Sequence, residues 1–289
     1  MCGLPAGRIG SVAVAVVSLV VFAAGVSWAS GPRAVAPSSF EPGSCVLFPP
    51  TTGNRNLRVF IDPGHGGPDP GGVGMTRTGV PVGEAPLNVL VAKDAARLLR
   101  QRGFSVVLSR SGPHAVARPL AGDIVGGVFT PKGEHRELVA RDVCANRVHA
   151  DVVIGIDFDA AGSPAATGSV TLYDALRPYA AANLRLARLV QHDVLASLRA
   201  DGAAIPNLGV HTDVGYGFLA TQADRNYGHL ILLGPAKRGY LNTPTTVPAA
   251  LIEPLFLTNP AEATLADSRA GQAAIGLGLA NAVQQFLAP

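Results

Sequence analysis

One histidine and several acidic residues of this chain occupy sequence positions at which they could bind a metal ion. His65 lies in a glycine-rich turn, "DPGHGG", directly after the apolar run 57–61. Acidic residues follow or precede other apolar runs: Glu84, Asp157, Asp159 and Glu253. Imidazole nitrogens and carboxylate oxygens bind zinc and related divalent ions, which can activate water for hydrolysis. A lone histidine in a loop is more often an ordinary surface residue, and carboxylates at strand ends often cap helices, so the pattern needs further support.

The elements that must position these residues alternate between strand and helix patterns. Apolar runs suited to strands cover residues 57–62, 104–110, 151–157, 168–174, 229–234 and 249–256. Helical periodicity covers 86–102, 136–149, a long segment with Leu186, Val190, Val194 and Leu198 on one face, and a last segment with Ile275, Leu279, Val283 and Leu287. This alternation predicts an α/β layer fold. Ligands of such folds gather beyond the carboxyl ends of the strands, where we expect His65 and the acidic residues to meet.

The N-terminal part of the chain has the features of an export signal. Residues 1–29 hold Arg8, an apolar stretch over 9–26 and small residues near Ala29, which predict a cleavable signal peptide. An uncleaved membrane anchor is the alternative, because the apolar stretch is long for a signal peptide. Residues 30–56 are rich in proline, serine and glycine and are interpreted as a linker or extended lead-in.

The charge and the cysteine content limit the possible partners of the protein and the cellular compartment in which it works. The formal net charge is +3, only 15% of residues are charged, and no basic cluster is present, so a nucleic-acid partner is not expected. Beyond residue 29 the chain holds two cysteines, Cys45 and Cys144. Two thiols in an exported chain commonly pair, and we expect a Cys45–Cys144 disulfide. Two unpaired thiols are the alternative.

Four motifs resemble one family. They are "FIDPGHGG", "GEAPLN", "RDVCANRVHAD" and "ALIEPLFLTNPAEATLADS", and in this order they resemble the zinc-dependent N-acetylmuramoyl-L-alanine amidases of the amidase-3 type. These hydrolases cut the amide bond between muramic acid and the stem peptide of peptidoglycan. The resemblance covers residues 57–288. It implies a single domain with a mixed, mostly parallel twisted sheet flanked by helices on both faces, and one Zn²⁺ ion or another divalent metal.

The resemblance assigns roles to individual residues. His65 occupies the first zinc-ligand position, and Glu84 the second. Glu253 matches the glutamate that resembles a general base in this family. Asn88 completes the E-x-x-x-N setting of Glu84 and is expected to support the metal ligands. Asp62 is a candidate to orient the His65 ring, or alternatively to cap the turn.

The third ligand position departs from the family pattern. The family expects a strand ending in something like "SIHAN", whereas this chain has "GIDFDA", with Asp157 in place of the histidine. A carboxylate can bind zinc, but its added negative charge makes the ion a weaker Lewis acid and loosens selectivity for zinc over manganese. Three interpretations stay open. Asp157 is the ligand, or His211 takes the position (His229 is a weaker candidate), or the metal is lost.

The expected function follows from these assignments. We expect an exported, monomeric peptidoglycan hydrolase of the cell envelope or extracellular space that acts on the stem peptide and glycan and touches a membrane only if residues 1–29 stay attached. The alternative is an impaired amidase fold that binds peptidoglycan or regulates cell-wall enzymes. The absence of an H-E-x-x-H motif disfavours a different metallopeptidase. Residues 111–134 form an insertion that is either a lid over the site or a surface loop.

Overall fold

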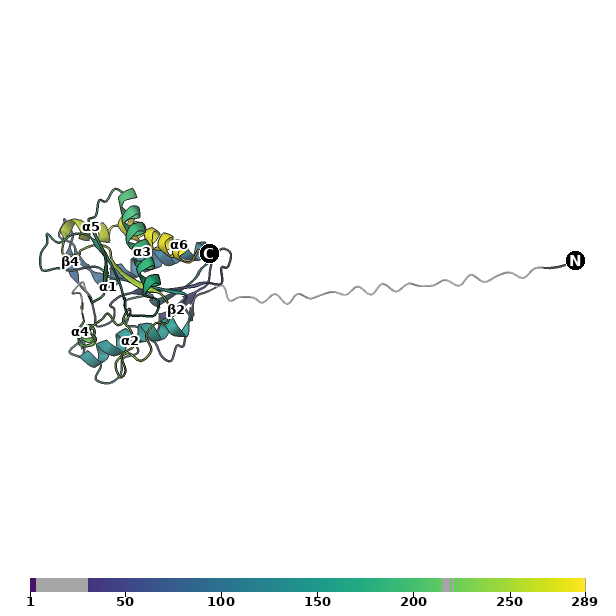
Figure 1. The fold of residues 1–289 in the computed structure, drawn as a ribbon, viewed down its shortest axis with the longest axis horizontal. Helices are drawn as coiled ribbons and strands as arrows, with labels where there is room; N and C mark the ends of the chain where they lie inside the picture. Colours follow the sequence, from purple (N-terminus) through teal and green to yellow (C-terminus); the bar gives the residue numbers. More distant parts are fainter. Residues whose placement is uncertain (4–30, 215–218, 220, 289) are drawn as a thin grey trace. The chain divides into compact units, whose positions relative to one another are not determined.

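The computed structural model describes residues 1–3, 31–214, 219 and 221–288. Residues 31–289 form one compact unit, drawn in Figure 1. The predicted signal peptide or anchor, residues 1–29, falls almost entirely outside the described residues. Within the described part of the chain, every helix is too short or too polar to cross a membrane.

An eight-stranded mixed sheet forms the centre of this unit. Its order is β1 (Arg33–Ala34), β2 (Ser44–Phe48), β6 (Ser105–Arg110), β3 (Arg58–Pro63), β9 (Val152–Ile156), β12 (Ala249–Glu253), β10 (Ser169–Tyr173) and β11 (Asn207–Thr212). The four middle strands β6, β3, β9 and β12 are parallel, and so are β10 and β11 to each other. Antiparallel pairing joins β10 to β12 and adds β2 and β1 at the other edge. The predicted α/β fold with a mixed sheet is confirmed.

Two small hairpins lie outside the main sheet. They pair β4 (Val73–Met75) with β5 (Pro81–Gly83), and β7 (Ile124–Val125) with β8 (Val128–Phe129). The second hairpin lies within the insertion 111–134, so this insertion is not wholly irregular.

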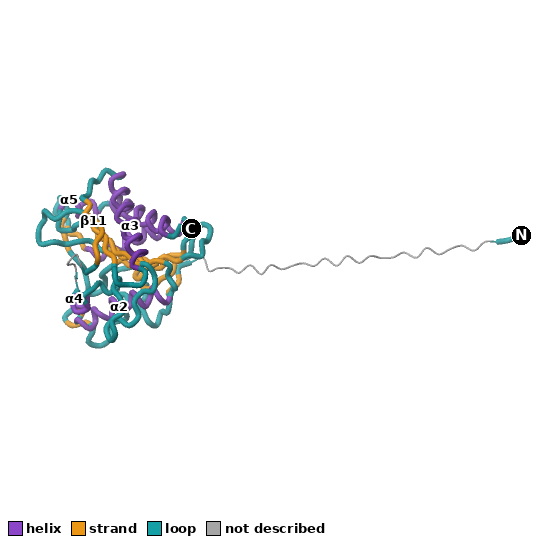
Figure 2. Tube along the Cα trace, viewed as in Figure 1, coloured by secondary structure: helices purple, strands orange, loops and turns teal. Residues whose placement is uncertain are grey.

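Helices cover both faces of the sheet, as Figures 1 and 2 show. One layer holds α1 (Glu84–Gln101), α3 (Ala180–Ala200), α5 (Pro260–Asp267) and α6 (Arg269–Phe286), and the other holds α2 (Pro131–Arg147) and α4 (Gln222–Tyr227). The predicted apolar stripe of α3 is buried against the sheet and α6: Leu186, Val190, Val194 and Leu198. Such burial of one helix face on each side of a sheet encloses two apolar cores.

Three sequence interpretations need correction. Residues 30–56 are not a separate linker, because β2 within them pairs with β6 and is buried. Residues 229–234 form turns rather than a strand. Their leucine and isoleucine side chains are buried, which explains the apolar run. The backbone N–H groups of Leu230 and Ile231 donate to the side chains of Asp213 and Asp224 rather than to a neighbouring strand. The edge strand β11 was not expected, because "NLGVHT" lacks a strong apolar pattern.

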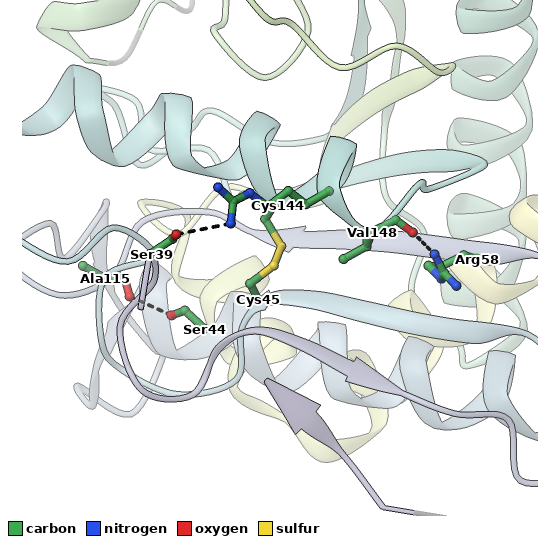
Figure 3. Close-up of a disulfide and its surroundings, with 8 residues drawn as sticks. Ser39, Ser44, Cys45, Arg58, Ala115, Cys144 and Val148 are labelled. Atoms are coloured by element: carbon green, nitrogen blue, oxygen red, sulfur yellow. Dashed lines mark hydrogen bonds between the residues drawn. A yellow bond between two sulfur atoms is a disulfide. The ribbon is translucent and has the colours of Figure 1, made fainter. Parts of the chain in front are cut away.

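A disulfide ties the lead-in segment to α2. Cys45 on β2 and Cys144 on α2 are bonded, with Cα atoms 5.8 Å apart, and both are fully buried. Figure 3 shows the bond beside the hydrogen bond from Ser44 to the carbonyl of Ala115. The predicted pairing is confirmed. It joins residues 99 positions apart and so anchors β2 at the sheet edge.

Candidate metal centre

The turn after β3 holds His65 in a strained backbone conformation. His65 has φ 61°, in the left-handed region that non-glycine residues rarely adopt, and Gly66 and Gly67 also have positive φ. The backbone oxygen of His65 accepts a hydrogen bond from Arg141 Nη2 at 2.8 Å. Non-glycine residues in this conformation persist where the surroundings enforce them, often at functional sites. The turn therefore presents the imidazole rather than merely tolerating it.

Three predicted ligand residues converge from different elements. His65 follows β3, Glu84 is the first residue of α1, and Asp157 follows β9. His65 Nε2 lies 3.0 Å from Glu84 Oε1 and 3.8 Å from Asp157 Oδ1, and one donor atom of each residue lies within 4.8 Å of the others. Two donors that bind one tetrahedral zinc ion at about 2.0–2.1 Å lie about 3.3 Å apart, close to these separations.

Backbone and amide groups hold the two carboxylates in place. Glu84 accepts hydrogen bonds from the backbone N–H of Phe158 at 2.9 Å and of Gly72 at 2.6 Å. Asn88 Nδ2 donates to Asp157 Oδ1 at 3.2 Å. Asp157 also lies so close to Gly64 that a Cβ there would approach Oδ1 to 1.6 Å. Only glycine fits at position 64, since any side chain would displace the carboxylate.

Asp69, rather than Asp62, orients the histidine ring. Asp69 Oδ2 lies 2.8 Å from His65 Nδ1, while Asp62 Oδ1 accepts a hydrogen bond from Arg141 Nη1 at 2.7 Å. A carboxylate on Nδ1 holds the proton on that nitrogen and leaves Nε2 free to bind a metal. The expectation for Asp62 is corrected because its side chain faces α2, whereas the turn brings the residue four positions after His65 back to the ring.

Two buried arginines brace the same turn. Arg110 donates to the backbone oxygens of Pro63 and Ala85, at 2.9 and 2.8 Å, and to that of Gly64. Arg141 bridges Asp62 and Glu137 by ion pairs of 2.7 and 3.0 Å. Sequence reasoning missed the arginines and Asp69. Arg141 opens the quoted motif "RDVCANRVHAD", and Asp69 lies in "GPDPGG", so the signal was present in both cases.

A pair of acids lies beside the three donors. Glu253 ends β12, and its buried carboxyl group lies close enough to Asp159 for the two acids to interact. Among the described residues no donor reaches Glu253 Oε2 or Asp159 Oδ2. Two ionised carboxylates can only accept hydrogen bonds, so the pair is satisfied when it holds one proton between the two groups. Glu253 shares a pocket with His65, Asp157 and Asp69, which places it where a base for this site should lie.

Burial and neighbouring charge shift the protonation of the site. Burial lowers the pKa of His65, but the charge of Glu84 and the hydrogen bond with Asp69 outweigh this and raise it well above its usual value. Burial raises the pKa of Asp157 to about 7, and the charge of Glu84 adds to the shift. Burial, followed by the charge of Asp159, raises the pKa of Glu253 well above its usual value. These groups crowd negative charge, which a cation would relieve.

The two alternative histidines do not join this cluster. His211 lies on the edge strand β11, and its Nε2 contacts the backbone oxygen of Leu208 at 2.8 Å. His229 belongs to a separate group with Asp174 and Asp213. Of the three interpretations of the missing histidine, this geometry favours Asp157 itself as the third donor.

The donor set fits a divalent metal ion. One imidazole nitrogen and two carboxylate oxygens form an anionic cluster with spacing suited to a tetrahedral ion, and the pocket leaves room for a further ligand. The sheet, the strand-end histidine and the adjoining acid pair are the features expected of a metal-dependent α/β hydrolase.

Comparison with known proteins specifies the class. The family profile described as N-acetylmuramoyl-L-alanine amidase, amidase-3, matches residues 59–285. The chain belongs to this family of peptidoglycan amidases, which is generally metal-dependent.

Individual relatives agree with the family assignment. The germination-specific N-acetylmuramoyl-L-alanine amidase of Bacillus subtilis is 28% identical over 207 residues, which is 72% of this chain and 70% of the relative. The amidase AmiA of Salmonella typhimurium is 26% identical over 250 residues, 81% of this chain and 77% of the relative. The crystal structure of an N-acetylmuramoyl-L-alanine amidase from Clostridium difficile 630 superposes with a TM-score of 0.55 at 25% identity, covering 80% of this chain and 96% of that one.

Proposed function

We propose that this protein hydrolyses the amide bond between N-acetylmuramic acid and the L-alanine of the stem peptide. The observation that carries the proposal is the convergence of His65, Glu84 and Asp157 at one point, with Glu253 lining the same pocket as His65 and Asp157. Family membership supplies the substrate class. His65, Glu84 and Asp157 would hold the metal, with Zn²⁺ the expected ion.

The residues of the chain divide the chemistry between them. A divalent ion bound here supplies a Lewis acid that polarises a carbonyl and acidifies water. Glu253 accepts a proton from the attacking water and delivers it to the leaving nitrogen as the carbon–nitrogen bond breaks. Burial and the neighbouring charge of Asp159 raise the pKa of Glu253, which makes its ionised form a stronger base toward water. The products are a carboxylic acid on the muramic acid and a free amino group on L-alanine.

The supporting shell keeps the reactive groups in register. Asp69 sets the His65 tautomer, and Asn88 fixes the oxygen of Asp157 that faces the histidine. Such partners of metal ligands often alter metal affinity or activity by about 10–100-fold when they are removed.

The site of action is proposed to lie outside the cytoplasmic membrane. The Cys45–Cys144 disulfide supports this, because such bonds persist in oxidising compartments. The apolar stretch over residues 9–26 is the proposed export signal.

The test is a digestion of purified peptidoglycan by the full chain. Mass spectrometry should find intact glycan strands and peptides with a new N-terminal alanine. A chelator should abolish the release and added Zn²⁺ should restore it. Release of glycan fragments, or of peptides cut at another bond, would contradict the proposal.

A non-catalytic wall-binding module is the second candidate, favoured by Asp157 standing where the family resemblance expects histidine. It predicts that the chain sediments with insoluble peptidoglycan but releases no peptide, with or without added metal. The same digestion therefore distinguishes the two functions.

A further inference from the structure

A second cluster of potential metal ligands lies outside the candidate active site. Asp174 follows β10, Asp213 follows β11, and His229 lies in the turn after α4. One donor atom of each lies within 4.8 Å of the others. Segments up to 55 residues apart therefore bring together one imidazole and two carboxylates, the same donor types as the first cluster.

The two carboxylates compete for one nitrogen. His229 Nδ1 lies 3.1 Å from Asp213 Oδ2 and 3.2 Å from Asp174 Oδ2. A ring nitrogen carries at most one proton, so it can donate to only one of the two oxygens. It bonds Asp213, and in the described part of the chain no hydrogen bond reaches Asp174 Oδ2. This arrangement leaves an acceptor of a buried carboxylate unsatisfied.

The remaining oxygens show that Asp174 is aimed at this point. Its Oδ1 accepts backbone N–H groups of Leu176 and Arg177, each at 2.8 Å, which turns Oδ2 toward the histidine. Asp213 Oδ1 likewise receives no hydrogen bond from any described residue. Both side chains are 1% exposed, so water outside the protein does not solvate these oxygens freely.

Among the described residues, no arginine or lysine forms an ion pair with either acid. The guanidinium of Arg177 donates to the backbone oxygens of Leu232 and Gly234 and to Thr245. When both carboxylates are ionised, the single histidine cannot compensate their combined negative charge. Burying an unpaired charge is costly, and a bound cation removes that cost.

We propose that Asp174, Asp213 and His229 form a second binding site for a divalent transition-metal ion of the zinc class. Donor separations of 3.1 and 3.2 Å match the spacing of about 3.3 Å around a tetrahedral zinc ion. The imidazole favours zinc over Ca²⁺ and Mg²⁺, which prefer sets of oxygen ligands.

The site has a structural consequence for the candidate active-site pocket. Leu230, Ile231 and Leu232, which follow His229, line the pocket that holds His65 and Glu253. The backbone N–H of Leu230 bonds Asp213 Oδ2 at 3.1 Å. An ion at the second cluster would link this wall to the ends of β10 and β11 and stabilise it.

Zinc stoichiometry tests the proposal independently of hydrolysis. The full chain is stripped of metal, loaded with Zn²⁺, desalted, and analysed by inductively coupled plasma mass spectrometry. We expect two ions per wild-type chain, one in His65→Ala, one in Asp174→Asn, and none in the double variant. Mg²⁺ and Ca²⁺ should not substitute. Asp193→Asn is the matched control, since Asp193 is a buried acid beside a single histidine, His192.

The outcomes separate the two sites. A wild-type chain with one ion and His65→Ala with none would overturn the second site, whether or not Asp174→Asn folds. Two ions retained in folded Asp174→Asn and Asp213→Asn would overturn it as well. Failure of the first site looks different, since His65→Ala would then bind as much zinc as the wild type. In His65→Ala, Zn²⁺ should also raise the Tm, and this rise should vanish when Asp174→Asn is added.

Discussion

The two histidine–carboxylate clusters offer the same donors but differ in their surroundings. His65 opens to a pocket, its Nδ1 is held by Asp69, and the buried acids Glu253 and Asp159 lie beside it. At the second cluster both acids are buried, and they are themselves the candidate ligands of the histidine's cluster. A donor set alone does not make a catalytic centre; access for substrate and a nearby base do.

The difference also has a topological origin. His65 and Asp157 follow the adjacent parallel strands β3 and β9, and Glu253 ends the next strand, β12. Three chain segments therefore present their side chains at the carboxyl ends of these strands. β10 runs antiparallel to β12, and Asp174, which follows β10, therefore lies toward the amino-terminal end of β12. The reversal of one strand sends a similar set of side chains away from the pocket where chemistry is expected.

The largest expected effect comes from replacing Glu253, the proposed general base. Glu253→Gln should lower the rate of peptidoglycan hydrolysis by about 10²–10⁴-fold, because the amide cannot take a proton from water. Zinc content should stay at the wild-type value. The measurement is peptide release beside metal analysis, with Glu41→Gln, a carboxylate of the lead-in segment, as the control. A Glu253→Gln chain with undiminished turnover would remove the residue from the mechanism.

The next effect tests the role of Asp69. Asp69→Asn should weaken zinc binding at the first cluster, or lower activity, by roughly 10–100-fold, because the amide no longer fixes the proton on His65 Nδ1. Competition with a chromophoric chelator measures the affinity. Asp62→Asn is the informative comparison, since it should act through folding stability by breaking the ion pair with Arg141. Equal loss of affinity in both variants would argue against a specific role for Asp69.

A smaller effect concerns the ligand charge of the first cluster. Asp157→His replaces a carboxylate by a neutral donor, so an ion held there becomes a stronger Lewis acid. We expect the rate at neutral pH to rise up to about tenfold and the preference for Zn²⁺ over Mn²⁺ to increase. Rates measured with each metal across about pH 5–9 test this expectation. A lower rate with full zinc content would indicate that the carboxylate suits the tight space beside Gly64 better.

The smallest effect is the pH dependence of stability without metal. The pKa of Asp157 is raised from 3.8 to about 7, so between these values the folded chain binds a proton that the unfolded chain releases. The raised pKa of His65 acts in the same direction above its usual value. Stability should therefore fall as pH rises from about 4 to neutrality and beyond. The Tm of the metal-free chain should decrease by a few degrees, and Asp157→Asn should flatten the trend. A rising Tm over this range would contradict it.

Much of the fold and the first cluster could be predicted from sequence because local signals agree with the tertiary structure. β9 is an uninterrupted apolar run, and the α3 stripe repeats with helical period, so both elements follow directly from the pattern. The motif resemblance placed His65, Glu84 and Asp157 before their convergence was seen. The strand predicted for residues 229–234 was wrong because their apolar side chains are required for burial and not for strand pairing.

The remainder depends on contacts that sequence spacing does not encode. Asp62 and Asp69 lie at similar distances from His65 along the chain, and only the path of the turn decides which reaches the ring. The second cluster joins residues from three loops without any shared motif. Strand β2 gave a weak signal within a proline- and serine-rich segment, and its place in the sheet rests on pairing with β6 and on the bond to α2.

That outer strand has a practical consequence for producing the protein. A truncated chain limited to the family-matched residues 59–285 would lose β2 and leave Cys144 as a free thiol. The backbone of β6 would then lie unpaired along one side, which invites association of sheets between molecules. Expression in a reducing cytoplasm would forgo the covalent link as well, at a cost of about 2–5 kcal/mol for a bond of this kind. Soluble material should therefore require the chain from residue 31 onward, folded under oxidising conditions.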